Sequence, residues 1–86
     1  MMYFVYILKS LHDKNLYIGS TKDLKRRLNE HVTGKVGSTK CRLPLELRYY
    51  EAFTTEKEAR TRESKLKERG SAHKELLRRI KSSIEN

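Results

Sequence analysis

An α+β fold is predicted by three features of the sequence: its length, its short strand-like runs and its longer stretches of helical periodicity. The chain has 86 residues, and a chain of this size buries too little surface to support two cores. We therefore expect one domain over residues 1–86. The runs and stretches follow one another in the order β-β-α-β-α-α, which predicts a three-stranded antiparallel sheet flanked by helices.

The first two strands form a predicted hairpin. Residues 3–8 are an almost unbroken apolar, aromatic and β-branched run, as expected of a central strand that is covered on both faces. A polar loop over residues 10–15 leads to residues 16–18, which return antiparallel to the first strand. Whether the side chains of Tyr6 and Tyr17 meet across this hairpin depends on the pairing register, which the sequence leaves open.

A helix is predicted over residues 22–32 and is followed by a flexible basic loop over residues 34–40. Ser20 or Thr21 would cap the first turn of this helix, in which Asp23 is favourably placed. The apolar residues recur every four positions and would face the sheet: Leu24, Leu28 and Val32.

The second half of the chain predicts one strand and two helices. Residues 45–53 begin after the single proline and alternate apolar and polar side chains at first, which indicates a third strand, at a sheet edge. Thr55 begins a capping-box motif, so a helix is expected from residue 56 to about residue 69. Ser71 would cap a last helix that carries apolar residues at helical spacing as far as Ile84.

The charge balance predicts a polyanionic partner. Twenty Lys and Arg residues face eleven acidic residues, which gives a net charge of +9 spread over the whole chain. Phosphate backbones are the commonest such partner, so nucleic acid is favoured, and DNA over RNA. The alternatives are that the charge only keeps the protein soluble or that it docks the protein on anionic lipid. No apolar run approaches the length that spans a membrane.

Cysteine usage is consistent with a reducing cytosol. Cys41 is the only cysteine, which excludes an internal disulfide and a cysteine-based metal site. The N-terminal residues do not have the pattern of a secretory signal, and we expect a cytoplasmic protein. Cys41 itself is interpreted as a small, semi-buried residue rather than as a reactive thiol.

One carboxylate stands on the predicted inner face of the helix over residues 56–69. Ala59, Glu63 and Leu66 lie on one line of that helix. Burying a carboxylate costs several kcal/mol unless it is paired, hydrogen-bonded or bound to a metal. Glu63 is therefore a metal or catalytic ligand, one half of a structural ion pair, for example with Arg27, or a residue at the helix edge.

Arg27 and His31 are four residues apart and share a face of the first helix, beside its apolar stripe. A guanidinium can hold a phosphate through two hydrogen bonds, and an imidazole can move a proton near neutral pH. Both residues could instead belong to a solvated basic face, and Tyr6 and Tyr17 could be packing aromatics. If they are functional, these two tyrosines, Arg27, His31 and Glu63 together supply the groups that metal-assisted phosphodiester hydrolysis needs.

Four segments together resemble the GIY-YIG nuclease domain, in particular its small stand-alone bacterial branch. They cover essentially the whole chain in the order and spacing of that family: Val5-Tyr6-Ile7, Leu16-Tyr17-Ile18-Gly19-Ser20-Thr21, Leu24 to His31, and Ala59 to Lys67. Two positions depart from the family pattern. Val5 stands where the first motif has glycine, as is frequent in this branch. Many members carry a polar residue after the metal-binding helix, and this chain has no clear counterpart. Asn86 is the only late asparagine, and we do not assign that role to it.

The resemblance implies a metal-dependent endonuclease with five site residues. Tyr6 and Tyr17 would be the two motif tyrosines, and Arg27 would bind the scissile phosphate. His31 would be an auxiliary residue, and Glu63 would be the single carboxylate that holds Mg²⁺ (or Mn²⁺) together with waters. One tyrosine would help to deprotonate the attacking water, and the sequence leaves open which one. A free phenol titrates at about pH 10, so this tyrosine would need nearby cations.

Exposed cations would bind backbone phosphates without reading base sequence, so specificity would be for shape or strandedness. The candidates are Lys22, Arg26, Lys35, Lys40 and Arg42. Two other functions are open. The chain could be a non-catalytic basic module that binds nucleic acid through a degenerate nuclease site. It could also be a structural adaptor in which Arg27 and Glu63 form a buried ion pair.

Overall fold

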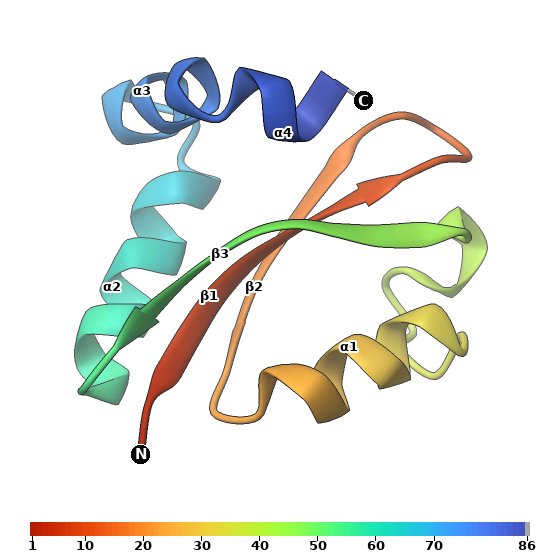
Figure 1. The fold of residues 1–86 in the computed structure, drawn as a ribbon, viewed down its shortest axis with the longest axis horizontal. Helices are drawn as coiled ribbons and strands as arrows, with labels where there is room; N and C mark the ends of the chain where they lie inside the picture. The colour runs from red at the N-terminus through yellow and green to blue at the C-terminus, as the bar shows by residue number, and fades with distance from the viewer. Residues whose placement is uncertain (86) are drawn as a thin grey trace.

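The computed structural model describes residues 1–85 and shows a twisted sheet with helices on both faces (Figure 1). The elements are β1 (Tyr3–Ser10), β2 (Leu16–Thr21), α1 (Leu24–Val32), the short 3-10 helix η1 (Lys40–Arg42), β3 (Leu45–Phe53), α2 (Glu56–Lys67), α3 (Ser71–Arg79) and α4 (Lys81–Glu85). The strand order is β2-β1-β3, and both pairs are antiparallel. This confirms the predicted fold, with β1 at the centre and β3 at an edge.

Residues 3–8 of strand β1 are apolar or aromatic because the strand contributes to two hydrophobic clusters, one on each face of the sheet. Its successive side chains point to opposite faces. Val5 and Ile7 belong to the cluster under α2 and α3, which also contains Ala59, Leu66 and Leu76. Tyr6 and Leu8 belong to the cluster under α1, which also contains Leu45. In Figure 1, α1 lies on one side of the strands, and α2 with α3 lies on the other.

The register of the hairpin brings the two motif tyrosines to one face. Tyr6 pairs with Gly19, and Tyr17 pairs with Leu8. Because Tyr6 and Leu8 are two residues apart, the two tyrosines both point toward α1, and their ring centroids are 6.4 Å apart. A Cβ atom at residue 19 would lie 2.5 Å from the Tyr6 hydroxyl oxygen and 2.6 Å from Cζ. The Tyr6 ring therefore crosses the β2 backbone at the one residue that has no side chain.

Helix α1 ends at Val32 as predicted, but its start, its cap and its buried face differ from the prediction. Its cap is Asp23, whose Oδ1 accepts a hydrogen bond from the backbone N–H of Arg26 at 3.0 Å; the prediction of Ser20 or Thr21 was wrong because β2 continues through both. Val32 is 44% exposed, whereas His31 is fully buried. At 100° per residue, residue 31 lies only about 20° from Leu24 around the helix, and residue 32 lies about 80° away.

The predicted last helix is two helices with a break at Ile80. Ile80 leaves the helical conformation, with φ −108° and ψ 23°, while its side chain packs on the α2–α3 cluster. The turn directs the end of α4 at two cations: Lys9 donates to the carbonyl of Ile84 at 2.8 Å, and Arg48 donates to that of Ser83 at 3.1 Å. These cations satisfy carbonyls that a helix end leaves without partners.

Smaller differences concern the caps of α2 and α3. Helix α2 begins as predicted, with the Thr55 hydroxyl accepting from the N–H of Glu58 at 3.2 Å, but it ends at Lys67 and Arg69 has a φ of +60°. The N-cap of α3 is Gly70, so Ser71 does not cap it.

Cys41 is exposed, contrary to the prediction of a semi-buried residue. It lies on η1, close to the fully buried side chain of Thr39, which takes the inward position. Among residues 1–85, no helix has the length and apolar character needed to cross a membrane.

We predict that Gly19→Ala lowers the stability of the fold, because the new Cβ overlaps the Tyr6 ring. Overpacking of this kind costs about 1–3 kcal/mol, which urea denaturation would measure. Gly37→Ala is the matched control, since a Cβ there meets nothing within 4 Å. Equal stability of the two variants would show that the Tyr6 ring is not confined by Gly19.

Candidate active site

Tyr6 and His31 form the buried centre of the candidate site. The Tyr6 hydroxyl lies 2.9 Å from Nε2 of His31, and Nδ1 of the same ring lies 2.9 Å from the hydroxyl of Thr39. Tyr6 is 2% exposed, and His31 and Thr39 are fully buried. A neutral imidazole has one donor and one acceptor nitrogen, so a continuous hydrogen-bonded chain connects β1, α1 and the loop before η1.

Tyr17 forms the outer part of this aromatic cluster. Its ring packs edge-on against the imidazole of His31, with centroids 5.0 Å apart. The side chain is only partly buried, and within residues 1–85 nothing hydrogen-bonds to its hydroxyl. The two predicted tyrosines are therefore brought together, with Tyr6 inside and Tyr17 accessible from solvent.

Burial keeps the inner pair uncharged. It raises the pKa of the Tyr6 phenol above its ordinary value, and the nearby guanidinium of Arg27 opposes that rise only in part. Burial also lowers the pKa of His31, and the positive charge of Arg27 lowers it further. The neutral imidazole can therefore act as a proton acceptor at neutral pH.

Arg27 lies between the aromatic cluster and solvent. Its side chain is 35% exposed, and its NH1 donates to Oε1 of Glu30 at 3.1 Å. Its charge also acts on both Tyr6 and His31, which places the guanidinium beside the phenol. A planar, partly exposed guanidinium in this position can receive a phosphate.

Glu63 reaches the site from α2, on the other face of the sheet. Ser20 donates a hydrogen bond to its Oε1 at 2.6 Å, and the ammonium of Lys67 lies 2.6 Å from its Oε2. Partial burial raises the pKa of Glu63, but hydrogen bonds from Lys67 and Ser20 outweigh that effect and leave the pKa below its usual value. The carboxylate is therefore ionised and held in one orientation.

The two halves of the site meet at strand β2. Gly19 lies under the Tyr6 phenol on the α1 side, while Ser20 binds Glu63 on the α2 side. The charge of Glu63 also contributes to the raised pKa of Tyr6, so the two groups are close enough to interact. The proposed ion pair between Arg27 and Glu63 was wrong, because these residues pair with Glu30 and Lys67 respectively.

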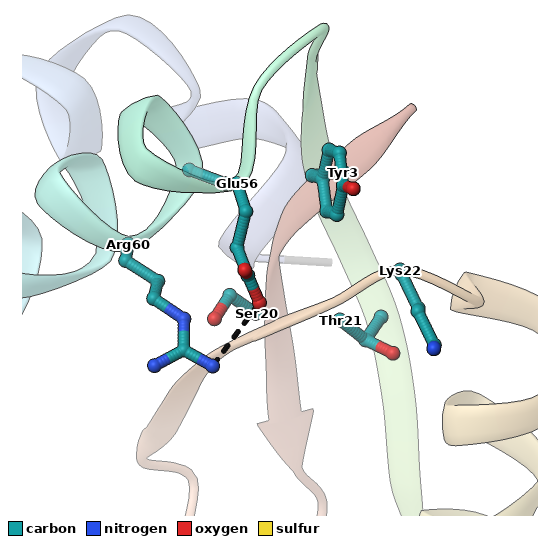
Figure 2. Close-up of a pocket in the computed structure, with 7 residues that line it drawn as sticks. Tyr3, Ser20, Thr21, Lys22, Glu56 and Arg60 are labelled. Carbon is teal, nitrogen blue, oxygen red and sulfur yellow. Dashed lines mark ion pairs between the residues drawn. The ribbon is translucent and has the colours of Figure 1, made fainter. Parts of the chain in front are cut away.

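A surface pocket lies beside Ser20, between the end of β2 and the first turns of α2 (Figure 2). Tyr3, Thr21 and Lys22 contribute to its wall. On the α2 side, NH2 of Arg60 lies 3.1 Å from Oε2 of Glu56. Arg60 also helps to lower the pKa of Glu63, so its positive charge extends the site beyond the carboxylate.

The residues around Glu63 fit a magnesium ion that keeps most of its waters. Among residues 1–85, no group of three or more acidic, histidine or cysteine side chains could hold a metal by itself. Mg²⁺ is commonly held by one or two carboxylates together with substrate phosphates and water. The chemistry of Glu63 matches this: it is ionised, only 20% exposed, and neutralised by an ammonium that a divalent cation could replace.

The five cations predicted to bind nucleic acid have different surroundings. Lys22, Lys35 and Lys40 are exposed and make no ion pair within residues 1–85. Arg26 pairs with Asp23 and Glu30 on the surface of α1.

Of these five cations, Arg42 makes the shortest ion pair. Its Nε lies 2.7 Å from Oδ2 of Asp13 in the hairpin loop, and its guanidinium lowers the pKa of Asp13 to about 2. Arg42 therefore ties η1 to the hairpin loop. Asn86, the only late asparagine, lies outside the described residues.

Three residues of the site were not anticipated from the sequence: Ser20, Lys67 and Thr39. The spacing of four residues between Glu63 and Lys67 was a signal that could have indicated their ion pair. Ser20 was interpreted only as a helix cap, and its role depends on the hairpin register. No sequence pattern connects Thr39 to His31, because a loop carries it back to α1.

Comparison with known proteins identifies a family and several similar proteins. The family model of the GIY-YIG catalytic domain matches residues 2–76. The UPF0213 protein SAG0778 of Streptococcus agalactiae serotype V is 45% identical over 67 residues, which are 77% of this chain and 75% of that protein. The UPF0213 protein SpyM3_1077 of Streptococcus pyogenes serotype M3 is 40% identical over 74 residues, 85% of this chain and 79% of that protein.

A solved structure is similar over nearly the whole chain. The solution NMR structure of the UPF0213 protein BH0048 from Bacillus halodurans has a TM-score of 0.58 and 35% sequence identity, and the match covers 94% of this chain and 86% of that one. The chain therefore belongs to the GIY-YIG nuclease family. Within that family, its relatives include small UPF0213 proteins.

We predict that the stability of the protein falls in mild acid because His31 is buried in its neutral form. An unfolded histidine takes up a proton at about pH 6.5, and the pKa of folded His31 is lower. The stabilising contribution is complete above the unfolded pKa and is lost as pH falls through the folded one. The melting temperature should therefore decrease from about pH 6.5 to about pH 5, above the range in which most carboxylates titrate.

The controls compare how steeply the melting temperature changes with pH, not the melting temperatures themselves, because removing a buried side chain destabilises the fold at every pH. His31→Gln should have a flatter dependence of melting temperature on pH. His12→Gln changes an exposed residue of the hairpin loop and should keep the slope of the wild type. Parallel curves for all three proteins would contradict the assignment to His31.

Proposed function

We propose that the protein is a metal-dependent endonuclease that hydrolyses phosphodiester bonds of nucleic acid, DNA in particular, with little sequence specificity. The observation that carries this proposal is that the cluster of Tyr6, His31 and Arg27 meets the Glu63 carboxylate at β2. The Tyr6–His31 hydrogen bond lies beside Arg27 on one side, and the ionised Glu63 carboxylate lies on the other. Hydrolysis of a phosphodiester needs a proton acceptor, a cation on the phosphate and a ligand for a divalent ion.

Glu63 would hold one divalent ion, Mg²⁺ or Mn²⁺, which when bound supplies positive charge for the leaving oxygen. Arg27 would bind the scissile phosphate and neutralise charge that develops on it. Ser20 would keep the Glu63 carboxylate in place through its hydrogen bond at 2.6 Å.

The two tyrosines would have different tasks. Tyr6 would take a proton from the attacking water while its own hydroxyl proton passes to Nε2 of His31, 2.9 Å away. This coupled transfer avoids forming a free phenolate, whose formation burial disfavours. Tyr17, the more accessible phenol, would hydrogen-bond to the substrate phosphate.

Specificity in this proposal comes from charge and shape. The exposed ammonium groups of Lys22, Lys35 and Lys40 would contact backbone phosphates, which carry no base information. Binding would weaken as salt concentration rises, because each phosphate contact releases counterions. Arg26 and Arg42 would contribute less, since acidic side chains already hold both.

A second candidate function is a nucleic-acid-binding module that does not cleave. The observation that favours it is the ion pair between Lys67 and Glu63 at 2.6 Å. This pair neutralises the carboxylate without a metal. A divalent ion would have to displace the ammonium before the nuclease chemistry could proceed.

We predict that Glu63→Gln reduces cleavage about a hundredfold or more, since loss of a catalytic metal removes several kcal/mol of transition-state stabilisation. Nicking of single-stranded, branched and duplex DNA with Mg²⁺ would measure this. Glu68→Gln, an exposed change just after α2, should leave cleavage unchanged. Cleavage that persists in Glu63→Gln or in EDTA would refute the nuclease mechanism, and salt-sensitive binding without cleavage would support the binding module.

We also predict that Lys67→Met tightens divalent-ion binding, because it removes the competing ammonium from Glu63. An interaction of about 1 kcal/mol corresponds to roughly fivefold in affinity. Titration with Mn²⁺, followed by electron paramagnetic resonance without nucleic acid, would measure it. Lys65→Met removes an exposed lysine from the same helix and should not change the affinity. Unchanged Mn²⁺ affinity in Lys67→Met would show that Lys67 does not occupy the metal position.

A further inference from the structure

Tyr50 is an aromatic side chain that the fold leaves in solvent. It lies on the edge strand β3 and is 53% exposed, the only tyrosine or phenylalanine of residues 1–85 that is more than about one-third exposed. An aromatic ring has a large apolar surface, and leaving it in water forgoes much of the stabilisation that burial gives. The position therefore needs an explanation other than core packing.

A second aromatic ring on the adjacent strand contacts Tyr50. Phe4 of β1 packs against Tyr50 in an edge-on arrangement, with ring centroids 6.0 Å apart. On the opposite face, Tyr49 donates a hydrogen bond to Glu51 at 2.7 Å, and Arg62 of α2 binds both oxygens of Glu51, at 2.8 and 2.9 Å. Residues on both sides of Tyr50 are thus fixed, so the exposed ring loses little freedom when a ligand binds it.

The ring is also close to the candidate active site. Tyr50 is the register partner of Tyr6 across β1 and β3, and Tyr6 is the partner of Gly19 across β1 and β2. All three positions form one row on the α1 face, and neighbouring strands are about 5 Å apart. Phe4 pairs with Thr21, which the exposed Lys22 follows. Tyr50 therefore lies one strand away from Tyr6 on the α1 face, and Phe4 connects it to the β1 side of the candidate site.

We propose that Tyr50, supported by Phe4, is a stacking surface for an unpaired nucleic-acid base next to the phosphate that Arg27 would hold. This inference rests on the proposed nuclease function. Every base has a flat π-face, so stacking on tyrosine is compatible with little sequence specificity. Exposed cations of the chain such as Lys22 would bind the phosphates on either side of such a base. A base inside a duplex cannot stack on Tyr50 unless its pair opens, so this surface selects unpaired or frayed strands.

A fluorescent substitution tests the contact directly. The chain has no tryptophan, so Tyr50→Trp creates a single indole that reports stacking at this position. In EDTA, where no cleavage occurs, a short oligothymidylate should quench the indole fluorescence. An oligonucleotide of the same length with abasic sites throughout offers the phosphates alone and should not quench it. Equal quenching by the two oligonucleotides would overturn the proposal.

Affinity measurements separate stacking from general apolar contact. Tyr50→Leu keeps an apolar side chain but not the ring, and it should bind oligothymidylate about 5- to 150-fold more weakly, the range expected for loss of one stacked base. Tyr50→Phe keeps the ring and should stay within about twofold of the wild type. Val32→Ala, at an exposed apolar residue of α1, should bind as the wild type does. Wild-type affinity in Tyr50→Leu, or equal losses for abasic and normal oligonucleotides, would overturn the proposal.

Two further measurements keep this inference distinct from the nuclease proposal. The binding series is repeated with Glu63→Gln, so that failure of cleavage leaves the stacking result intact, and cleavage by Tyr50→Leu is measured with saturating substrate. If the indole fluorescence of the Tyr50→Trp variant changes with protein concentration alone, the surface belongs to a contact with a second copy of the chain, and the proposal is overturned. Melting temperatures of the Tyr50 variants should match that of the wild type, because Tyr50 lies outside both hydrophobic clusters.

Discussion

The passage of the Tyr6 ring over the backbone of Gly19 constrains the whole candidate site. Because residue 19 has no side chain, the phenol can cross the edge strand and reach His31 on α1. The next residue, Ser20, points to the opposite face and binds Glu63 on α2. Helices α1 and α2, which pack on separate hydrophobic clusters, are thereby positioned on opposite sides of two adjacent residues of β2. A change in the hairpin register by one residue would separate them, since it would reverse the face of every side chain on the strand.

Two different electrostatic environments lie side by side at this strand. On the α1 side, burial keeps Tyr6 and His31 neutral, and the pKa shifts of the two groups both disfavour charge. On the α2 side, Glu63 is partly exposed and stays ionised beside Lys67. Transfer of the Tyr6 proton to His31 would leave the two opposite charges adjacent, so neither buried charge would be isolated. A cation can be exchanged at the carboxylate because solvent reaches it. Each half of the site thus suits a different chemical step.

Local periodicity was sufficient to predict the three strands, their antiparallel arrangement and the first helix, because each depends on neighbouring residues. The meeting of Tyr6 and Tyr17 could not be predicted, since it depends on how two strands pair. Val32 was wrongly assigned to the inner face of α1 because spacing by fours drifts away from the 3.6-residue turn, whereas His31, expected beside the apolar stripe, is the buried residue. Ser20 has no distinguishing local pattern, and only the assembled sheet connects it to Glu63. The catalytic roles of the site residues remain predictions.

Strand β3 contains a β-bulge, which affects the surface of the sheet. Leu47 pairs with Leu8 and Tyr49 pairs with Ile7, so Arg48 is an extra residue with no partner on β1. Before the bulge, odd-numbered residues face α1; after it, even-numbered residues do. Strict alternation from Leu45 would therefore have assigned Tyr49 to the α1 face and hidden Tyr50 under α2. One additional residue in an edge strand thus determines which of two adjacent tyrosines is locked into the ion-pair network and which is presented to solvent.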